Sequence, residues 1–255
     1  MQIEGKRVIV TGGSSGMGEA AVRVFVREGA LVAALDVQDE RGASVAAAAN
    51  DEGPGRAVYH HCDVRRRDEV QTSFARAVED LGGLDALVHI AGVEGSSSAE
   101  EMTEEEWDRV VDVNLKGTFL TNQAAFPYLR DAGGRILNFA SSAGLIMFPN
   151  HGHYVASKAG VIAWSRSLAL EWGRYGINVN AITPFALTPM TRDFQEALSS
   201  EARAAFEAHV AATPAGRLGD PETDIAPVLV FLLSDASRYV TAQIIGIDGG
   251  NVPVR

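Results

Sequence analysis

Tyr154 and Lys158 are four residues apart in a stretch whose apolar residues recur at helical spacing. Positions four apart lie on one face of a helix, so these two side chains would be neighbours. An ammonium beside a phenol favours the phenolate and lowers the tyrosine pKa from its usual value of about 10. Such a tyrosine can take a proton from an alcohol, or give one to a carbonyl oxygen, near neutral pH. The same spacing also occurs on ordinary helices, where the tyrosine packs and the lysine is solvated.

A second group with chemical potential is the glycine-rich segment Gly12-x-x-x-Gly16-x-Gly18, which follows a short apolar run and precedes an amphipathic helical pattern. Strand, glycine turn, helix and strand in succession form a βαβ unit. Glycines let the turn tighten and the backbone approach a pyrophosphate, whose charge suits the amides at a helix N-terminus. The segment therefore predicts a dinucleotide site, and its flanks argue against a plain flexible turn.

Asp36 ends the second predicted strand, twenty residues after Gly16. A carboxylate at that position can accept hydrogen bonds from both hydroxyls of an adenosine ribose, and it repels a 2′-phosphate. The turn residues 13–15 and 37–38 contain no arginine or lysine that would bind such a phosphate. The sequence thus predicts NAD rather than NADP as the cofactor.

The elements that must position these residues alternate between strand and helix along the whole chain. Strands are predicted at 6–11, 31–35, 57–62, 84–90, 135–139, before Pro184 and at 243–248, with helical patterns between them. Because no hairpin signals separate the strands, we expect a parallel sheet covered on both faces. The predicted fold is α/β: a single-domain, Rossmann-like doubly wound fold over 1–255, with a seven-stranded parallel sheet.

Asp63, Ala91 and Gly92 follow predicted strands, so they lie on the same rim of the sheet as the glycine-rich turn. Ligands of such sheets bind beyond the carboxyl ends of the strands. Simple loop residues remain the alternative interpretation for these three.

Asn114 lies in a helical pattern over 101–130, between apolar neighbours that indicate burial. Burial favours a structural or catalytic hydrogen bond over a surface position for this asparagine. Ser141 follows a predicted strand and precedes Tyr154 by thirteen residues, a loop long enough to bring both hydroxyls to one pocket.

Composition limits the classes of function. The 255 residues carry a net charge of −11, which disfavours nucleic acid and anionic membrane surfaces as partners. Cys62 is the single cysteine, so an internal disulfide is excluded, and no metal site is predicted. The first residues enter a strand pattern without an apolar signal region, and no apolar run reaches membrane-spanning length. We expect a cytoplasmic protein.

Over nearly its whole length, the chain resembles the short-chain dehydrogenase/reductase family. The matching segments are Thr11-Gly-Gly-Ser-Ser-Gly-Met-Gly18, Asp36, Asp63-Val64, Ala91-Gly92, Asn114, Ser141, Tyr154-x-x-x-Lys158, Asn180-Ala181 before Pro184, and Ile247-Asp248-Gly249-Gly250. In this order and spacing the set is specific to the family.

The resemblance implies a role for each matching residue. Tyr154 would be the general acid/base, and Lys158 would hold the nicotinamide ribose and lower the tyrosine pKa. Ser141 would bind the substrate oxygen, with Ser142 as the alternative, and Asn114 would anchor a water of a proton relay. The implied cofactor-binding residues are Gly12, Ser14, Ser15, Gly16, Met17, Gly18, Asp36, Asp63, Val64, Ala91, Gly92, Pro184 and Thr188, together with Tyr154 and Lys158. Asp63 would meet the adenine amino group, Val64 the adenine ring and Thr188 the carboxamide.

Three features depart from the family pattern. His89-Ile90 stands where the family has two asparagines, which puts a sheet-stabilising bond in doubt. Phe185 replaces a glycine and cannot take a glycine's φ at low cost, so the path to Thr188 is in doubt. His151 and His153 are interpreted as ordinary loop histidines, with lining of the substrate pocket second and a metal site a poor third.

The implied activity is NAD-dependent hydride transfer between the nicotinamide and a secondary alcohol or ketone. Several aromatic and aliphatic residues suggest that this substrate is apolar. A 3-oxoacyl thioester (acyl-carrier) reductase, which should prefer NADP, is one alternative; a non-catalytic nucleotide-binding regulatory protein is another. A helical segment at about 189–216 is expected to cover the substrate. The helical segments 107–130 and 154–174 carry more apolar residues than packing against one face of a sheet requires. Because members of the family are commonly tetramers built through these helices, we predict a homotetramer.

Overall fold

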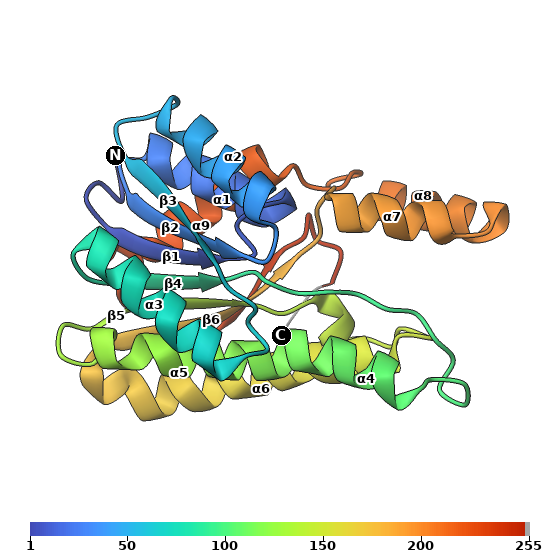
Figure 1. Cartoon of the computed structure of the whole chain (residues 1–255). Helices are drawn as coiled ribbons and strands as arrows, with labels where there is room; N and C mark the ends of the chain where they lie inside the picture. Colours follow the sequence, from blue (N-terminus) through green and yellow to red (C-terminus); the bar gives the residue numbers. More distant parts are fainter. Residues whose placement is uncertain (253–255) are drawn as a thin grey trace.

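The seven strands run parallel in one sheet, in the order β3-β2-β1-β4-β5-β6-β7 (Figure 1). They are β1 (Arg7–Thr11), β2 (Leu31–Asp36), β3 (Arg56–His61), β4 (Ala86–His89), β5 (Gly134–Phe139), β6 (Ile177–Pro184) and β7 (Ile244–Ile247). The structure is a computed structural model that describes residues 1–252. The strand order reverses between β1 and β4, which is where ligands of doubly wound sheets bind. The predicted fold class is confirmed.

Helices cover both faces of the sheet (Figure 1). They are α1 (Gly16–Arg27), α2 (Asp39–Asn50), α3 (Arg67–Leu81), α4 (Glu104–Val111), α5 (Gly117–Leu129), α6 (Gly152–Trp172), α7 (Pro189–Ala197), α8 (Ser200–Ala212) and α9 (Ala226–Leu233). Helices α1, α2 and α9 share one hydrophobic cluster with the sheet, and α3, α5 and α6 share a second cluster on the opposite face.

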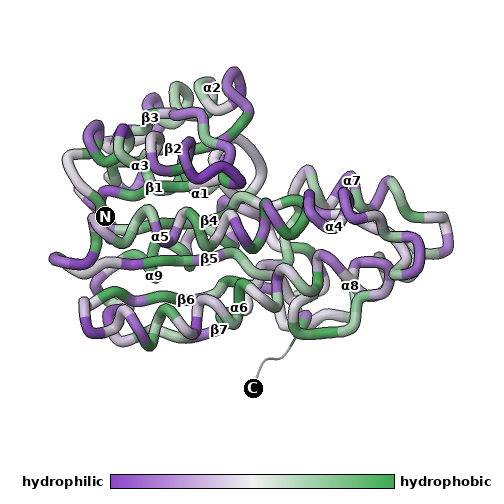
Figure 2. Tube along the Cα trace, turned by 60° about the horizontal axis from the view of Figure 1, so that its bottom comes forward, coloured by the Kyte–Doolittle hydropathy of each residue, from purple (hydrophilic) through white to green (hydrophobic). Residues whose placement is uncertain are grey.

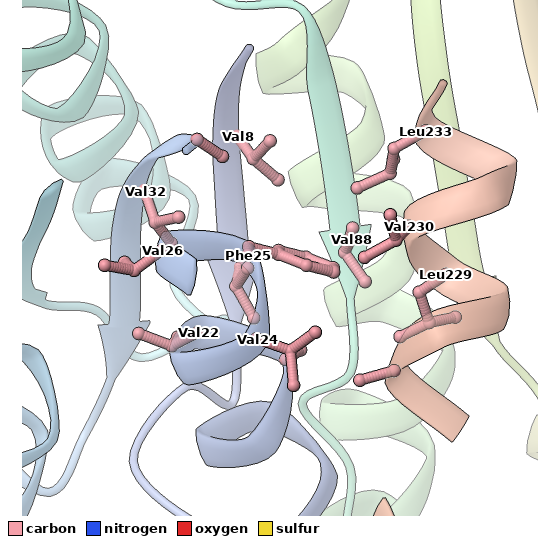
Figure 3. Close-up of a cluster of buried hydrophobic side chains, with 14 of the residues drawn as sticks. Val8, Val22, Val24, Phe25, Val26, Val32, Val88, Leu229, Val230 and Leu233 are labelled. Atoms are coloured by element: carbon pink, nitrogen blue, oxygen red, sulfur yellow. The ribbon is translucent and has the colours of Figure 1, made fainter. Parts of the chain in front are cut away.

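Side chains of β1 alternate between these two clusters. Val8 and Val10 of β1 pack with Phe25 of α1 and Leu229 of α9, whereas Ile9 belongs to the other cluster. Figure 3 shows Phe25 and Leu229 directed from their helices toward the buried strands. Complete burial of such a side chain stabilises the fold by about 1.5–3 kcal/mol. Successive residues of the strand thus pack against the helices on opposite faces of the sheet.

The predicted helix 101–130 is interrupted by a π-helical turn, Asp112–Lys116, between α4 and α5. In this turn the Gly117 N–H donates to the carbonyl of Asp112, five residues back. Asn114 lies inside the turn and is 1% exposed. Single π turns within helices are frequent at functional sites.

Helices α7 and α8 form the excursion that the sequence predicts between β6 and the last helix, but as two helices rather than one. Neither has a buried residue, and both extend away from the sheet (Figure 1). Figure 2 shows that hydrophilic segments recur along them, in contrast to the hydrophobic strands. The hydroxyls of Thr188 and Ser199 cap the two helices by accepting backbone N–H groups. Across residues 1–252, none of the helices combines the length and apolar character needed to cross a bilayer.

Candidate active site

Two adjoining cavities open at the carboxyl edge of the strands, where the sequence places its candidate residues. The glycine-loop cavity, of ≈ 400 Å³, is lined by Gly12, Ser15, Gly16, Asp36, Asp63, Val64, Ala91 and others. The tyrosine cavity, of ≈ 350 Å³, is lined by Ser141, Ser142, Tyr154, Lys158, Pro184, Glu94 and others. The residues common to both are Met17, Ile90, Gly92, Val93, Thr188 and Met190.

Close backbone approach shapes the glycine loop. A Cβ on Gly12, whose φ is +71°, would lie 2.8 Å from the Ala91 nitrogen. A Cβ on Gly18 would lie 1.8 Å from the Gly12 carbonyl oxygen. Ser14 and Gly18 are buried and do not line the glycine-loop cavity. Side chains at Gly12 and Gly18 would collide with this backbone and distort the loop that approaches a phosphate.

Asp36 is held rigidly at the end of β2. Its Oδ1 accepts backbone N–H groups of Val37 at 2.7 Å and Gln38 at 3.1 Å, and its Oδ2 accepts that of Ser14 at 3.2 Å. These bonds fix a carboxylate at the wall of the glycine-loop cavity. The geometry suits acceptance of hydroxyl donors and opposes a phosphate.

Asp63 already has a strong partner, Arg65, which the sequence analysis overlooked. The guanidinium donates to both carboxylate oxygens, with Nη2 at 2.6 Å from Oδ2. The hydrogen bond from Arg65 lowers the pKa of Asp63. Arg65 also lines the glycine-loop cavity, so a basic residue is present there after all. A signal was available: arginine lies two positions after a carboxylate at a strand end, within reach of it.

Tyr154 and Lys158 occupy the first two turns of α6, as the spacing predicts. The Lys158 ammonium donates to the Phe139 carbonyl at 2.8 Å and lies 5.8 Å from the centroid of the Tyr154 ring. Ser141 and Ser142 line the same cavity as Tyr154.

The lowered tyrosine pKa predicted from the four-residue spacing is wrong for this structure. Burial raises the pKa of Tyr154 to about 12; the Ser141 hydroxyl opposes this shift and the charge of Glu94 adds to it. Burial also lowers the pKa of Lys158 to about 8. Both shifts have the same cause, since low polarity disfavours the charged form of either group.

Asn114 uses its side chain to tie together three segments. Its Oδ1 accepts the Val93 N–H at 2.8 Å, and its Nδ2 donates to the Val93 carbonyl at 2.9 Å and to Ser157 Oγ at 3.1 Å. The π turn directs the amide inward, where it links the loop after β4 to α6. The amide thus positions the loop that lines both cavities.

His89, which stands at the position of a family asparagine, links β4 to β1 and α5. Its Nδ1 lies 2.8 Å from Thr11 Oγ1 on β1 and 3.1 Å from Thr121 Oγ1 on α5. Burial, with a smaller effect of the Lys158 charge, lowers the pKa of His89 to about 3. The imidazole is therefore neutral in the folded protein at physiological pH.

Replacing His89 by asparagine is expected to make the free energy of unfolding less sensitive to acid. The unfolded chain protonates this histidine near pH 6.5, but the folded chain does so only near pH 3, so acid favours unfolding between those values. From about pH 7.5 to about pH 5.5 the natural protein should lose about 1.4 kcal/mol more than the variant. Urea denaturation at both pH values measures this difference. Parallel losses in the two proteins would contradict it.

The loop after β6 follows a path that Phe185 can adopt. Among residues 1–252 the non-glycine residues with positive φ are Asn150 and Ala242, so Phe185 avoids the strain that the sequence suggested. Pro184 and Phe185 line the tyrosine cavity, and Thr188 lines both cavities. The Thr188 hydroxyl accepts the Thr191 N–H at 3.2 Å.

His151 and His153 are buried, which corrects their interpretation as ordinary loop histidines. His151 stacks on Phe148 with ring centroids 3.9 Å apart, and its Nε2 lies 3.4 Å from Oε1 of Glu94. Glu94 lines the tyrosine cavity. No cluster of three or more metal-binding side chains occurs within 1–252.

Comparisons with known proteins agree on one family. A family model described as Enoyl-(Acyl carrier protein) reductase matches residues 12–251. The 3-oxoacyl-acyl-carrier-protein reductase FabG of Thermotoga maritima is 41% identical over 255 residues, which cover 99% of this chain and 100% of that protein. The 3beta-hydroxysteroid dehydrogenase 1 of Eggerthella lenta is 39% identical over 251 residues, covering 97% and 94%. The crystal structure of levodione reductase superimposes with a TM-score of 0.92 at 35% identity, covering 97% and 98%.

The fold and the two cavities are those of a nicotinamide-dependent oxidoreductase. The chain belongs to the short-chain dehydrogenase/reductase family. It is an oxidoreductase that acts on alcohols or ketones.

Proposed function

We propose that the protein transfers a hydride between NAD and a secondary alcohol or ketone, with Tyr154 as the general acid/base. The observation that carries this proposal is the placement of Tyr154, Ser141 and Lys158 in one cavity that adjoins the glycine loop and Asp36. When bound, NAD would supply the hydride acceptor for alcohol oxidation, and NADH the hydride for ketone reduction.

The protein's own groups then hold the substrate and move its proton. Ser141 orients the substrate oxygen, and Tyr154 exchanges a proton with that oxygen. With a pKa of about 12 the phenol is a proton donor at neutral pH, which suits carbonyl reduction. Alcohol oxidation needs the phenolate, which positive charge from Lys158 and the oxidised cofactor favours. Asn114 holds the loop that closes the site behind Lys158.

The glycine loop and Asp36 fit an adenosine diphosphate portion. Gly12 and Gly16 leave room for a pyrophosphate at the start of α1, and the Asp36 carboxylate faces the same cavity. We assign Ser15, Met17, Val64, Ala91 and Gly92 to the walls of this site, and Pro184 and Thr188 to its nicotinamide end. We also assign Asp63 to this site, together with its partner Arg65. Ser14 and Gly18 contribute indirectly, by supporting the glycine loop.

Replacing Asp36 by asparagine should shift the cofactor preference from NAD toward NADP. The natural carboxylate repels a 2′-phosphate, and like charges placed together cost several kcal/mol. We expect the ratio of kcat/KM for NAD to that for NADP to fall about tenfold or more. Steady-state rates with each cofactor measure the ratio, and Glu40→Gln, at an exposed site on α2, is the charge-matched control. Equal use of both cofactors by the natural protein would defeat the NAD assignment.

A second candidate is reduction of a 3-oxoacyl thioester. The similarity to the Thermotoga maritima reductase favours it, whereas Asp36 and the net charge of −11 argue for NAD and against an acidic carrier. A panel assay separates the two: secondary alcohols with NAD, their ketones with NADH, and a 3-oxoacyl thioester with NADPH. Turnover of the alcohols with NAD supports the first proposal, and exclusive turnover of the thioester supports the second.

We further propose that α7 and α8 form a lid over the substrate.

We also propose a homotetramer assembled through α4, α5 and α6. These three helices expose Trp107, Tyr128 and Leu170, the last at 86%. Exposed apolar side chains grouped on helices favour a partner surface. Light scattering at micromolar concentration should give about four times the mass of one chain. A monomeric mass would refute the assembly, and Leu170→Glu should lower the mass if α6 contributes.

A further inference from the structure

Glu94 places a carboxylate in the wall of a cavity otherwise dominated by aromatic and aliphatic side chains. The segment around it is fixed from two sides. Arg109 donates to the Glu94 carbonyl at 2.9 Å, and the Ser97 N–H donates to the Asn150 carbonyl at 2.8 Å. Ser97 also forms a β-bridge with His151. A carboxyl group held in this way, rather than free on a flexible loop, is part of a built site.

His151 is the partner of this carboxylate, and the pair must share a proton. Nδ1 of His151 lies 2.7 Å from the Pro149 carbonyl, which can only accept, so Nδ1 carries a hydrogen. Nε2 faces Oε1 of Glu94 at 3.4 Å. Two acceptors would repel, so either Nε2 or the carboxyl group carries one further proton. His151 is 6% exposed, and within residues 1–252 its Nε2 makes no ordinary hydrogen bond.

The carboxyl group still has capacity for a ligand. Among residues 1–252 the polar side-chain contact of this carboxylate is the one with His151, and Glu94 also lines the cavity. Burial raises the pKa of Glu94, as expected of a carboxyl group with too few donors. The charges that face this region are Arg109, Glu106 and His153, and none of them occupies the carboxylate.

The surrounding chemistry selects the class of ligand. The Lys158 ammonium lines the same cavity and opposes a cationic substrate, and the Glu94 carboxylate opposes an anionic one. Phe148, Phe194 and Phe206 supply apolar walls. A neutral oxygen remains: a hydroxyl can donate to the carboxylate, and a carbonyl can accept from the protonated pair.

We propose that Glu94, positioned by His151, binds a second oxygen of the substrate, so that the enzyme prefers compact diols or hydroxyketones to simple alcohols. This inference rests on the proposed function, because Tyr154 and Ser141 take the first oxygen. Glu94 and Tyr154 line one cavity, so one substrate can meet both groups.

The test compares cyclohexanol with the isomeric cyclohexanediols in the full-length protein with NAD. We expect kcat/KM for the best diol to exceed that for cyclohexanol about tenfold or more, as a hydrogen bond to a charged group provides. Glu94→Leu should bring this ratio close to one, and Glu94→Gln should leave an intermediate ratio. Glu100→Leu, at an exposed position on the same loop, is the control and should keep the natural ratio.

Two further variants test whether His151 positions the carboxyl group. His151→Gln offers a polar atom near Nε2, and His151→Asn offers one near Nδ1 alone. The ratio of kcat/KM for the best diol to that for cyclohexanol should be better preserved in His151→Gln than in His151→Asn.

Turnover of cyclohexanol without a preference for any diol, or an unchanged ratio in Glu94→Leu, would overturn the inference and leave the proposed function intact. Failure to turn over any of these alcohols in either direction would remove the proposed function, and the inference with it.

Discussion

Tyr154→Phe is expected to lower kcat by about a hundredfold to ten-thousandfold while cofactor affinity stays within a few fold. The phenylalanine ring keeps the packing of α6 and the position above Lys158, so the change removes only the hydroxyl that exchanges the proton. The variant should therefore fold and bind NAD. Cofactor titration by fluorescence and single-turnover measurement of reduced nicotinamide separate binding from chemistry.

Tyr239→Phe is the matched control, because it removes the same hydroxyl from a tyrosine that is 99% exposed to solvent. Ser141→Ala and Ser142→Ala, compared side by side, decide which serine orients the substrate oxygen. Near-normal kcat in Tyr154→Phe would mean that another group handles the proton and that the proposed mechanism is incorrect.

Gly18→Ala should abolish cofactor binding and reduce the free energy of unfolding by about 3 kcal/mol or more. The added Cβ would lie 1.8 Å from the Gly12 carbonyl oxygen, and backbone atoms cannot move aside as a flexible side chain can. Forcing extra atoms into packed regions costs about 1–3 kcal/mol even where side chains can adjust. Relief of this clash displaces the glycine loop from the start of α1, so the cradle for the pyrophosphate is lost.

Gly173→Ala supplies the comparison for this variant. Its added Cβ meets nothing within 4 Å, and its φ of −55° is ordinary for alanine. This substitution should be neutral or stabilising by about 0.4–1 kcal/mol. Urea denaturation and NAD titration of both variants test the contrast. Equal stability and equal NAD affinity in the two variants would contradict the expected clash between a Cβ at position 18 and the Gly12 carbonyl.

Much of the fold could be predicted because its signals are local. The β1 segment is a short apolar run followed at once by glycines, and the chain then repeats strand and helix without hairpin signals. Parallel order follows from that alternation. The candidate residues gather at one edge because Gly12 follows β1, Asp36 is the last residue of β2 and Asp63 comes shortly after β3.

The remaining features depend on surroundings that spacing does not encode. Tyr154 and Lys158 are neighbours as predicted, but burial of both groups, rather than their separation, controls their pKa values. Arg65 follows Asp63 in the sequence, yet its turn toward the cavity is a property of the folded loop. The pairing of Glu94 with His151 joins residues that are far apart in the chain.

The π turn after α4 constrains the number of residues that can connect α4 to α5. It contains one residue more than an α turn would, and each residue of a regular helix rotates the next by about 100°. Removing one residue from Asp112–Lys116 would restore a continuous helix but rotate every later side chain of α5 away from the sheet, or rotate Asn114 away from Val93. We therefore expect a single-residue insertion or deletion in Asp112–Lys116 to disrupt either the packing of α5 or the Asn114 contacts.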